Sequence, residues 1–301
     1  MKRCLTGWLI WLCLFSGCFV AIAEAGSLGS QITPDIFKKG IIWQIKSPQG
    51  KLSHVIGTMH VSDPGVWKVF GHAKFAYDSA SIVCTEVKLD FVTMAAEMQS
   101  MFFTDGRTLR SVINNKALYR QVVSVAKSKG YPEALVSNMK PFSVTFLLNM
   151  PASKGRALDE KIFSDAVLAG KQVCGLETVE EHSHIFKIYT LEQQIRLLKH
   201  TLNHANSFDK IYPAMLAAYV DRDLLKLAKM TNQSLAMGDE TIENRFIQKF
   251  LIDRNIKMVQ RMEPLIKKGK AFFAIGAMHL PGKAGVLRLL QDKGYEITRV
   301  Y

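Results

Sequence analysis

A short motif that occurs twice constrains the fold of this chain more than any other feature. Residues 55–60 and 274–279 are each an apolar run that reaches a glycine and, three residues later, a histidine. Glycine at the end of a strand permits a tight turn. Ligand crevices of open α/β sheets usually lie at the carboxyl ends of the strands. We therefore expect two strands that present His60 and His279 to one shared site.

The spacing Gly-x-x-His is weak evidence when it occurs once. A single histidine is more often a surface residue or a core residue with its hydrogen bonds satisfied. The same apolar lead-in before both His60 and His279 favours a functional pair. Imidazole is the commonest side-chain ligand of transition metals, so the pair predicts a metal site.

Strand and helix signals alternate in the first part of the chain. A turn composition at residues 47–50 separates two β-prone runs, which predicts a hairpin. Asp63 and Pro64 are typical of a helix start. The expected elements are a hairpin over residues 41–60, a helix over 66–80 and a strand over 81–87, which together form a right-handed βαβ unit.

The middle of the chain is mostly helical, and a second βαβ unit follows it. Pro264 predicts a break or kink late in the last long helix. The second unit consists of a strand over 271–275, a helix over 285–292 and a strand over 295–301. In the middle we expect helices over 91–103, 115–128, 132–136, 141–149, 158–169, 190–204, 208–230 and 240–268, and a strand over 171–177.

These signals predict the α/β class with mixed α+β character. We expect a central mixed β-sheet built from two pseudo-symmetric βαβ-type halves, flanked by many helices, with a helical insertion between the halves. After a leader segment, residues 26–301 are expected to form one domain. Its halves would cover about residues 41–150 and 151–301.

The first residues read as a secretory signal peptide. Lys2 and Arg3 precede an apolar stretch over residues 9–20, and Ala23-Glu24-Ala25 offers a small-x-small cleavage pattern. Residues 1–25 therefore predict export to the periplasm or the medium. Residues 14–18 also resemble a lipobox, which would anchor the protein through a lipid on Cys18. No later segment approaches the roughly 20 apolar residues of a membrane span.

Two of the five cysteines, Cys84 and Cys174, lie beyond the predicted signal peptide. Both fall in apolar, strand-like runs, so buried free thiols are the simpler interpretation. A disulfide would be possible in an oxidising compartment if the two strands were neighbours. The sequence alone leaves both alternatives open.

The chain carries a formal net charge of +13, but its basic residues are dispersed. The basic runs lack the interleaved aromatic residues of single-strand binders, so we expect no nucleic-acid partner. An anionic membrane or cell surface is a more economical partner for an exported basic protein. A solvated surface without any partner is the simplest interpretation. The oligomeric state is not predictable from these features.

Polar residues at four predicted strand ends are candidates for chemistry: His60, Glu86, Glu177 and His279. Two histidines with one or two carboxylates suit a hydrolytic divalent metal site. Glu86 interrupts an apolar strand, and a buried carboxylate requires a metal, an arginine or a proton role. A structural ion pair is the alternative for Glu86, and a helix amino terminus is the alternative for Glu177.

Two further pairs of residues are weaker candidates. Arg254 and Asn255 lie on a long predicted helix, where Arg254 could pair with Glu86, stabilise an oxyanion or simply lie on the surface. His182 and His184 match a metal pair by spacing only, in a predicted polar turn. The chain lacks Gly-x-Ser-x-Gly, His-Glu-x-x-His, a phosphate loop and Gly-x-Gly-x-x-Gly.

Together these motifs resemble the TraB/GumN family, which includes the TIKI-type membrane metalloproteases. The resemblance covers residues 41–301 and is most specific at 56–64 and 272–282. The position after Glu181, often glutamine in the family, is His182 here. Further matching segments are residues 82–87, 158–159, 175–181 and 254–255.

The resemblance implies a fold shared with erythromycin-esterase-like and ChaN-like proteins, with both Gly-x-x-His motifs in one cleft. TIKI-like members imply metal-dependent peptide cleavage that favours Mn²⁺ or Co²⁺, with Zn²⁺ also possible. Many bacterial members have no assigned substrate. The expected substrate is a peptide or another small hydrolysable molecule.

The resulting hypothesis is an exported metallopeptidase. His60, His279, Glu86 and Glu177 would hold the ion, and Glu86 could also take a proton from water. Two alternatives remain. One is a metal-free, esterase-like hydrolase, and the other is a periplasmic haem- or metal-binding protein. Under the first hypothesis Arg254 and Asn255 orient carboxylates or the substrate carbonyl, and Asp159, Met59 and Met278 contact substrate.

Overall fold

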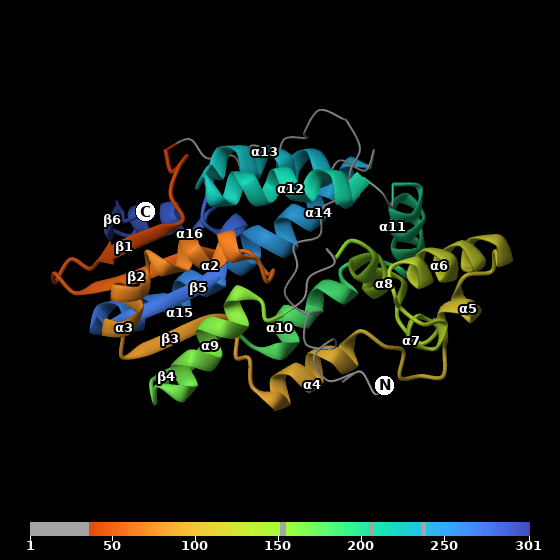
Figure 1. Cartoon of the computed structure of the whole chain (residues 1–301), viewed down its shortest axis with the longest axis horizontal. Helices are drawn as coiled ribbons and strands as arrows, with labels where there is room; N and C mark the ends of the chain where they lie inside the picture. Colours follow the sequence, from red (N-terminus) through yellow and green to blue (C-terminus); the bar gives the residue numbers. More distant parts are fainter. Residues whose placement is uncertain (1–35, 151–154, 205–206, 236–238) are drawn as a thin grey trace.

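The computed structural model describes residues 36–150, 155–204, 207–235 and 239–301 (Figure 1). The predicted signal peptide and the Cys18 lipobox lie outside these residues. Across the four described ranges, every helix is too short or too polar to cross a bilayer.

The strands of the described chain form one six-stranded mixed sheet in the order β4-β3-β5-β2-β1-β6. The four strands from β4 to β2 run parallel to one another, and β1 pairs antiparallel with both β2 and β6. This confirms the mixed sheet and the amino-terminal hairpin. The strands are β1 (Ile42–Lys46), β2 (Leu52–Thr58), β3 (Ile82–Val87), β4 (Gln172–Glu177), β5 (Ala271–Gly276) and β6 (Glu296–Arg299).

The two strands that carry the repeated motif are neighbours. Strand β5 lies between β2 and β3, and it pairs with β2 so that Gly57 is opposite Ile275 and Thr58 is opposite Gly276. The strands of each predicted βαβ unit are therefore parallel but not adjacent. The crossover from β2 to β3 passes over β5, which comes from the far end of the chain.

Helices cover both faces of the sheet (Figure 1). One face carries α2 (Pro64–Gly71), α3 (Lys74–Ser79) and α9 (Leu158–Leu168), and the other carries α15 (Asp253–Lys268) and α16 (Val286–Asp292). Right-handed crossovers require this division, because the connections to β3 and β4 run toward one sheet edge and those to β5 and β6 run toward the other.

The remaining helices form the predicted helical insertion, most of it beside the sheet (Figure 1). They are α4 (Phe91–Ser100), α5 (Leu109–Val112), α6 (Lys116–Ser128), α7 (Glu133–Val136), α8 (Pro141–Leu148), α10 (Val179–Ser183), η3 (His184–Lys187), α11 (Leu191–Asn203), α12 (Ser207–Val220), α13 (Leu224–Leu235), α14 (Glu240–Phe246) and the π-helical η4 (Ile247–Ile252), with η5 (Ala277–His279) after β5.

Several predicted helix boundaries are wrong. The helix expected over 66–80 is the pair α2 and α3, and the helix expected over 208–230 is the pair α12 and α13. Arg222, with φ of 60°, lies between α12 and α13. Helix α15 continues through Pro264 to Lys268. Pro264 and Gln260 are exposed, so the carbonyl that loses its helical hydrogen bond there can bind water instead.

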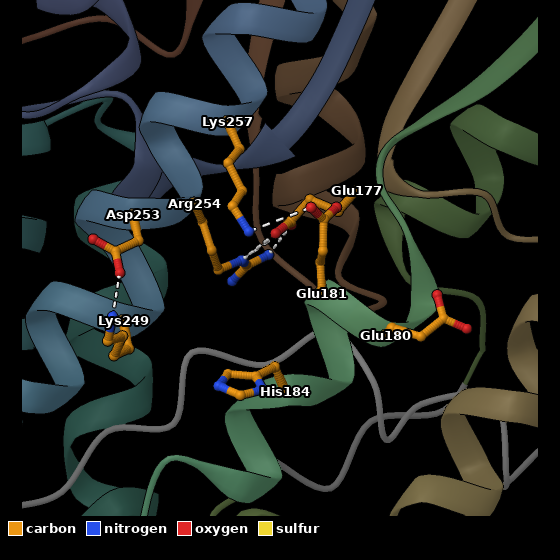
Figure 2. A pocket seen from close by; sticks show the side chains of 8 residues that line it. All are labelled: Glu177, Glu180, Glu181, His184, Lys249, Asp253, Arg254 and Lys257. Atoms are coloured by element: carbon orange, nitrogen blue, oxygen red, sulfur yellow. Dashed lines mark hydrogen bonds and ion pairs between the residues drawn. The ribbon is translucent and has the colours of Figure 1, made fainter.

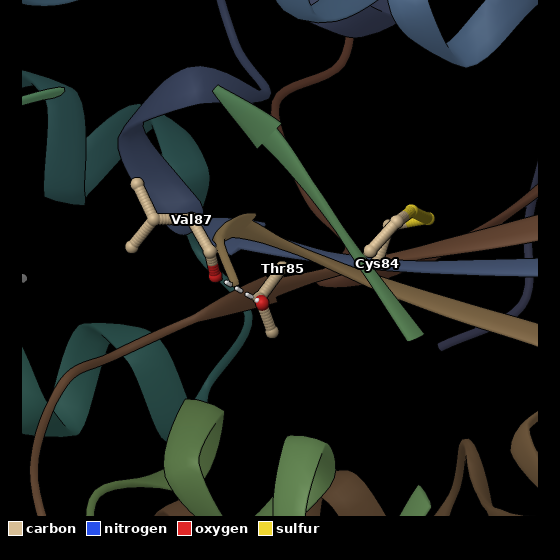
Figure 3. The surroundings of a disulfide bond; sticks show 4 residues. Cys84, Thr85 and Val87 are labelled. Atoms are coloured by element: carbon tan, nitrogen blue, oxygen red, sulfur yellow. Dashed lines mark hydrogen bonds between the residues drawn. A yellow bond between two sulfur atoms is a disulfide. The ribbon is translucent and has the colours of Figure 1, made fainter. Parts of the chain in front are cut away.

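A disulfide joins Cys84 and Cys174, so the free-thiol interpretation is wrong. Strands β3 and β4 are neighbours, and the two cysteines are direct partners in their register, with their Cα atoms 4.5 Å apart (Figure 3). The bond therefore ties the edge strand β4 to the interior of the sheet. Glu86 and Glu177 follow these cysteines closely on the same two strands.

We expect the double variant Cys84→Ala/Cys174→Ala to lose about 2–4 kcal/mol of unfolding free energy, because the bond closes a loop with a sequence separation of 90 residues. Urea unfolding of the oxidised, reduced and variant proteins measures this difference. Mass spectrometry after alkylation should find both thiols blocked in the unreduced protein. Equal unfolding midpoints for all three proteins would contradict the prediction.

Candidate active site

The carboxyl ends of the four parallel strands bring the predicted site residues together. His60 follows β2, Glu86 lies in β3, Glu177 ends β4, and His279 lies in η5 after β5. All four side chains are buried, with exposed fractions between 1% and 8%. The sequence predicted that these residues lie at strand ends. Because β4, β3, β5 and β2 are adjacent in the sheet, those strand ends lie side by side.

Three of these side chains converge on the space beside Gly276. A Cβ atom at this position would lie 3.0 Å from Glu86 Oε1, 3.6 Å from His60 Nε2 and 3.5 Å from His279 Cδ2. The backbone nitrogen of Gly276 also donates a hydrogen bond of 2.6 Å to Glu86 Oε1. Glycine is required here because a side chain would fill the space that the three groups surround.

The glycine of the first motif has a different role. A Cβ atom on Gly57 would lie 2.7 Å from Leu280 Cδ1 and 2.9 Å from the Cα of Ala277. Gly57 therefore lets the backbone of the second motif pack directly against the first. Neither glycine has a positive φ, so a left-handed turn is not the reason for glycine at these positions. The reason is that neighbouring atoms lie close to both backbones.

The imidazole of His60 is held from behind by Asp159. His60 Nδ1 donates to Asp159 Oδ2 over 2.5 Å, and the hydroxyl of Thr58 donates to the other Asp159 oxygen. Burial lowers the pKa of His60, but the charge and hydrogen bond of Asp159, together with Glu86, raise it above its ordinary value. Both oxygens of Asp159 are occupied, so this residue orients His60 from a buried position.

The imidazole of His279 is held in a similar way by Asn255. His279 Nδ1 lies 2.6 Å from Asn255 Oδ1, and Asn255 Nδ2 donates to the carbonyl of Ala284 over 2.8 Å. This second bond orients the amide, so Nδ1 of His279 is the donor. Burial lowers the pKa of His279 to about 4, which leaves the ring neutral at pH 7. Its free Nε2 lies 3.7 Å from Glu86 Oε1.

Arg254 bridges the two strand-end carboxylates. Its Nη2 lies 2.5 Å from Glu86 Oε2 and 2.6 Å from Glu177 Oε2, and its Nε lies 2.9 Å from Glu177 Oε1. The predicted pairing with Glu86 is confirmed, and Arg254 is buried rather than on the surface. Both oxygens of Glu177 are engaged by this guanidinium.

Arg254 also determines the ionisation of Glu86. Burial opposes the charged form of Glu86, but His279 and Arg254 lower its pKa well below the ordinary value. Because His279 is neutral at pH 7, the positive charge of Arg254 is the largest contribution that persists there, and His60 and His182 also lower the pKa of Glu86. Burial lowers the pKa of Arg254, but the charges and hydrogen bonds of Glu177 and Glu86 raise it by more. The net pKa lies above its ordinary value, so the guanidinium stays charged.

The sequence analysis missed the pair formed by His182 and Glu97. His182 Nδ1 lies 2.8 Å and 3.0 Å from the Glu97 oxygens, and its Nε2 lies 3.8 Å from Glu86 Oε2. Both residues are buried, and His182 belongs to α10 rather than to a polar turn, whereas His184 is exposed. The signal in the sequence was Glu97 at helical spacing from Met94, which is also buried.

Two groups of side chains that share Glu86 are candidates for a cation site, and in the described chain only the second has three ligand atoms within 4.8 Å of one another. The first consists of His60, Glu86 and His279 around Gly276. The second consists of Glu86, Glu177 and His182. Among the described residues the site buries four carboxyl groups: Glu86 and Glu177 pair with Arg254, Asp159 pairs with His60, and Glu97 pairs with His182.

Two cavities flank this centre. A polar cavity of about 310 Å³ opens beside Arg254 and Glu177 (Figure 2). A smaller, mostly apolar cavity of about 60 Å³ begins at His60 and Gly276 and includes both motif methionines, Met59 and Met278. The polar cavity is lined by Glu177, Glu180, Glu181, His184, Lys249, Asp253, Arg254 and Lys257.

Sequence comparisons identify relatives of this chain. It is 24% identical to the Metalloprotease TIKI2 of Danio rerio over 96% of this chain and 67% of the relative, and 25% identical to the Metalloprotease TIKI2 of Xenopus tropicalis over 81% and 57%. An uncharacterized protein of Treponema pallidum is 20% identical over 95% of this chain and 90% of the relative.

This chain therefore spans only about three fifths to two thirds of the two TIKI2 proteins, 57% and 67% of their lengths. No solved structure matches it significantly. The model of the TraB/PrgY/gumN family matches residues 41–299, which include every residue of the site described above. The chain belongs to the TraB/PrgY/gumN family.

Proposed function

We propose that the protein is a metal-dependent hydrolase, and more specifically a TIKI-like metallopeptidase, that holds a divalent ion with His60, Glu86 and His279. The observation that carries this proposal is the convergence of these three groups on the space beside Gly276. The relatives named as metalloproteases support it.

The chemistry of the three donors, and the spacing of two of them, suit a divalent ion. Both imidazoles are fixed through Nδ1, which leaves Nε2 for the ion, as is usual for metal-binding histidines. Ligands about 2.1 Å from a tetrahedral ion lie about 3.4 Å apart, and His279 Nε2 lies 3.7 Å from Glu86 Oε1. Imidazole and carboxylate ligands suit Mn²⁺, Co²⁺ and Zn²⁺, and we retain Mn²⁺ or Co²⁺ as the expected ions.

A bound ion would act as a Lewis acid on a carbonyl group and would increase the acidity of water. The protein supplies the remaining functions. Arg254 holds Glu86 Oε2, so Oε1 is the oxygen that faces the imidazoles and would bind the ion. Glu177 keeps Arg254 in place, and Asn255 keeps His279 in one orientation.

The second group, with Glu177 and His182, supports a metal site less well. A cation between Glu86 and Glu177 would compete with Arg254, whose guanidinium already bonds both carboxylates. Separating those ion pairs would leave a buried arginine without its partners, which is costly. We therefore assign Glu177 and Asn255 to positioning roles in this proposal.

The disulfide supports export. Disulfides persist mainly in oxidising compartments, and the bond between Cys84 and Cys174 fits the secretory signal predicted over residues 1–25. We propose a periplasmic or secreted protein, with lipid attachment at Cys18 as the alternative. A peptide is the proposed substrate, and association with an anionic membrane surface would suit the net charge of +13.

The variants His60→Ala and His279→Ala should each lose bound metal and hydrolytic activity while remaining folded, because each removes one ligand. Elemental analysis after incubation with Mn²⁺, Co²⁺ or Zn²⁺ measures the metal, and circular dichroism checks the fold. His184→Ala is the matched control, because His184 is exposed on the polar cavity. Full metal uptake by both variants would refute the ligand assignment.

The variant Asn255→Ala should weaken metal affinity about 10–100-fold, because it releases the His279 ring without removing a ligand. Asn255→Asp retains an acceptor for Nδ1 and should lose less. Competition with a chromogenic chelator measures both affinities. Asn138→Ala, at an exposed asparagine, serves as the control, and an affinity for Asn255→Ala equal to that of the control would contradict the role of Asn255.

Exhaustive chelation separates the proposed function from its alternatives. Peptide hydrolysis should disappear on chelation and return with added Mn²⁺ or Co²⁺. Hydrolysis that survives chelation would favour a metal-free, esterase-like reaction with His60 as base and Glu86 as its partner. Haem absorbance of the purified protein without any peptide or ester hydrolysis would favour the binding protein.

A further inference from the structure

Most residues that line the small cavity beside His60 have no role in the proposed metal centre. The two motifs form its floor, and helices α12 and α13 form its roof with Met215, Tyr219, Leu227 and Thr231. The floor consists of Thr58, Met59, His60, Gly276, Ala277 and Met278. Because His60 and Gly276 belong both to this floor and to the proposed metal centre, the cavity continues directly from that centre.

The cavity lining offers mainly apolar surface. The hydroxyl of Tyr219 donates to the carbonyl of Gly57 over 2.8 Å, and the hydroxyl of Thr58 donates to Asp159, so these two groups are already engaged. Met59, Met215 and Met278 contribute flexible, polarisable side chains that adapt to different apolar shapes. Most of this lining is apolar, so a charged group would exchange its hydration for a surface with few polar atoms, which is unfavourable.

The size of the cavity sets the size of its occupant. A single water requires about 10–15 Å³ of such space, so 60 Å³ accommodates about four to six heavy atoms. The side chains of leucine, isoleucine and methionine have this size. A tryptophan side chain is too large, and glycine leaves the cavity empty.

We propose that this cavity is a specificity subsite that receives one aliphatic side chain, of leucine, isoleucine or methionine type, from the residue next to the scissile bond. The role of this subsite in peptide cleavage rests on the proposed peptidase function. The cavity itself can be tested without hydrolysis. A peptide whose aliphatic side chain fills it would hold its backbone against His60 and Gly276.

Methyl NMR tests binding directly, because the chain has 13 methionines and three of them line the cavity. The metal-free protein, labelled with ¹³C at the methionine methyls, is titrated with N-acetyl-leucinamide and N-acetyl-methioninamide. The signals of Met59, Met215 and Met278, assigned by single substitution to leucine, should shift. The corresponding glycine and lysine amides should bind the cavity about tenfold more weakly than the leucine and methionine amides, as judged from the shifts of the same methyl signals.

Two variants of residues outside the proposed metal centre test whether the ligands bind in this cavity. Leu227→Phe fills the cavity and should abolish the shifts, whereas the same substitution at exposed Leu168 should leave them unchanged. If Leu227→Phe does not fold, Met215→Ala provides the reciprocal test. It enlarges the cavity and should allow N-acetyl-phenylalaninamide to shift the two remaining methyls.

The outcomes separate this inference from the proposed function. Absent shifts, or equal shifts with the glycine, lysine and leucine amides, overturn the subsite whatever the enzyme hydrolyses. Selective shifts together with failure to cleave any peptide carrying leucine, isoleucine or methionine refute the peptidase function and leave an aliphatic binding site. Selective shifts together with a preference of at least about tenfold in kcat/KM for such peptides support both.

Discussion

The contact between β2 and β5 is the constraint on which the site depends. Gly57 and Gly276 lie in neighbouring parallel strands; a Cβ atom would clash at Gly57 and would be tightly confined at Gly276. Gly57 admits the backbone at Ala277, and Gly276 leaves the space into which Glu86, His60 and His279 point. A side chain at Gly57 would push the two motifs apart, and one at Gly276 would press against Glu86. The repeated motif is therefore a packing device as well as the source of both buried histidines.

A buried charge network surrounds this contact. Arg254 is the one guanidinium among the buried residues of the described chain, and it holds Glu86 and Glu177 at the ends of adjacent strands. Such networks contribute little net stability, since desolvation of the charges offsets their attraction. Here the network orients Glu86 and keeps it ionised. The disulfide two residues before Glu86 holds the same pair of strands together.

Much of this arrangement was predictable from local patterns. The apolar runs before Gly57 and Gly276, and Glu86 within an apolar strand, indicated strands that end at a polar site. The cost of burying an isolated carboxylate predicted a metal, an arginine or a proton role for Glu86, and the arginine is present as Arg254. Local patterns failed where distant segments meet. Glu97 and His182 form a buried pair across 85 positions, and neither has a sequence neighbour that indicates the other.

The sequence by itself determined the strand and helix content, the repeated glycine-histidine motif and the identity of most candidate site residues. These properties depend on the periodicity of apolar residues and on the cost of burying charge, both of which are local. Only the tertiary structure decided that β5 lies between β2 and β3, that Cys84 faces Cys174, and that Asp159 and Asn255 stand behind the two histidines. Strand order and register arise from packing between residues far apart in the chain, and a single sequence does not record those distances.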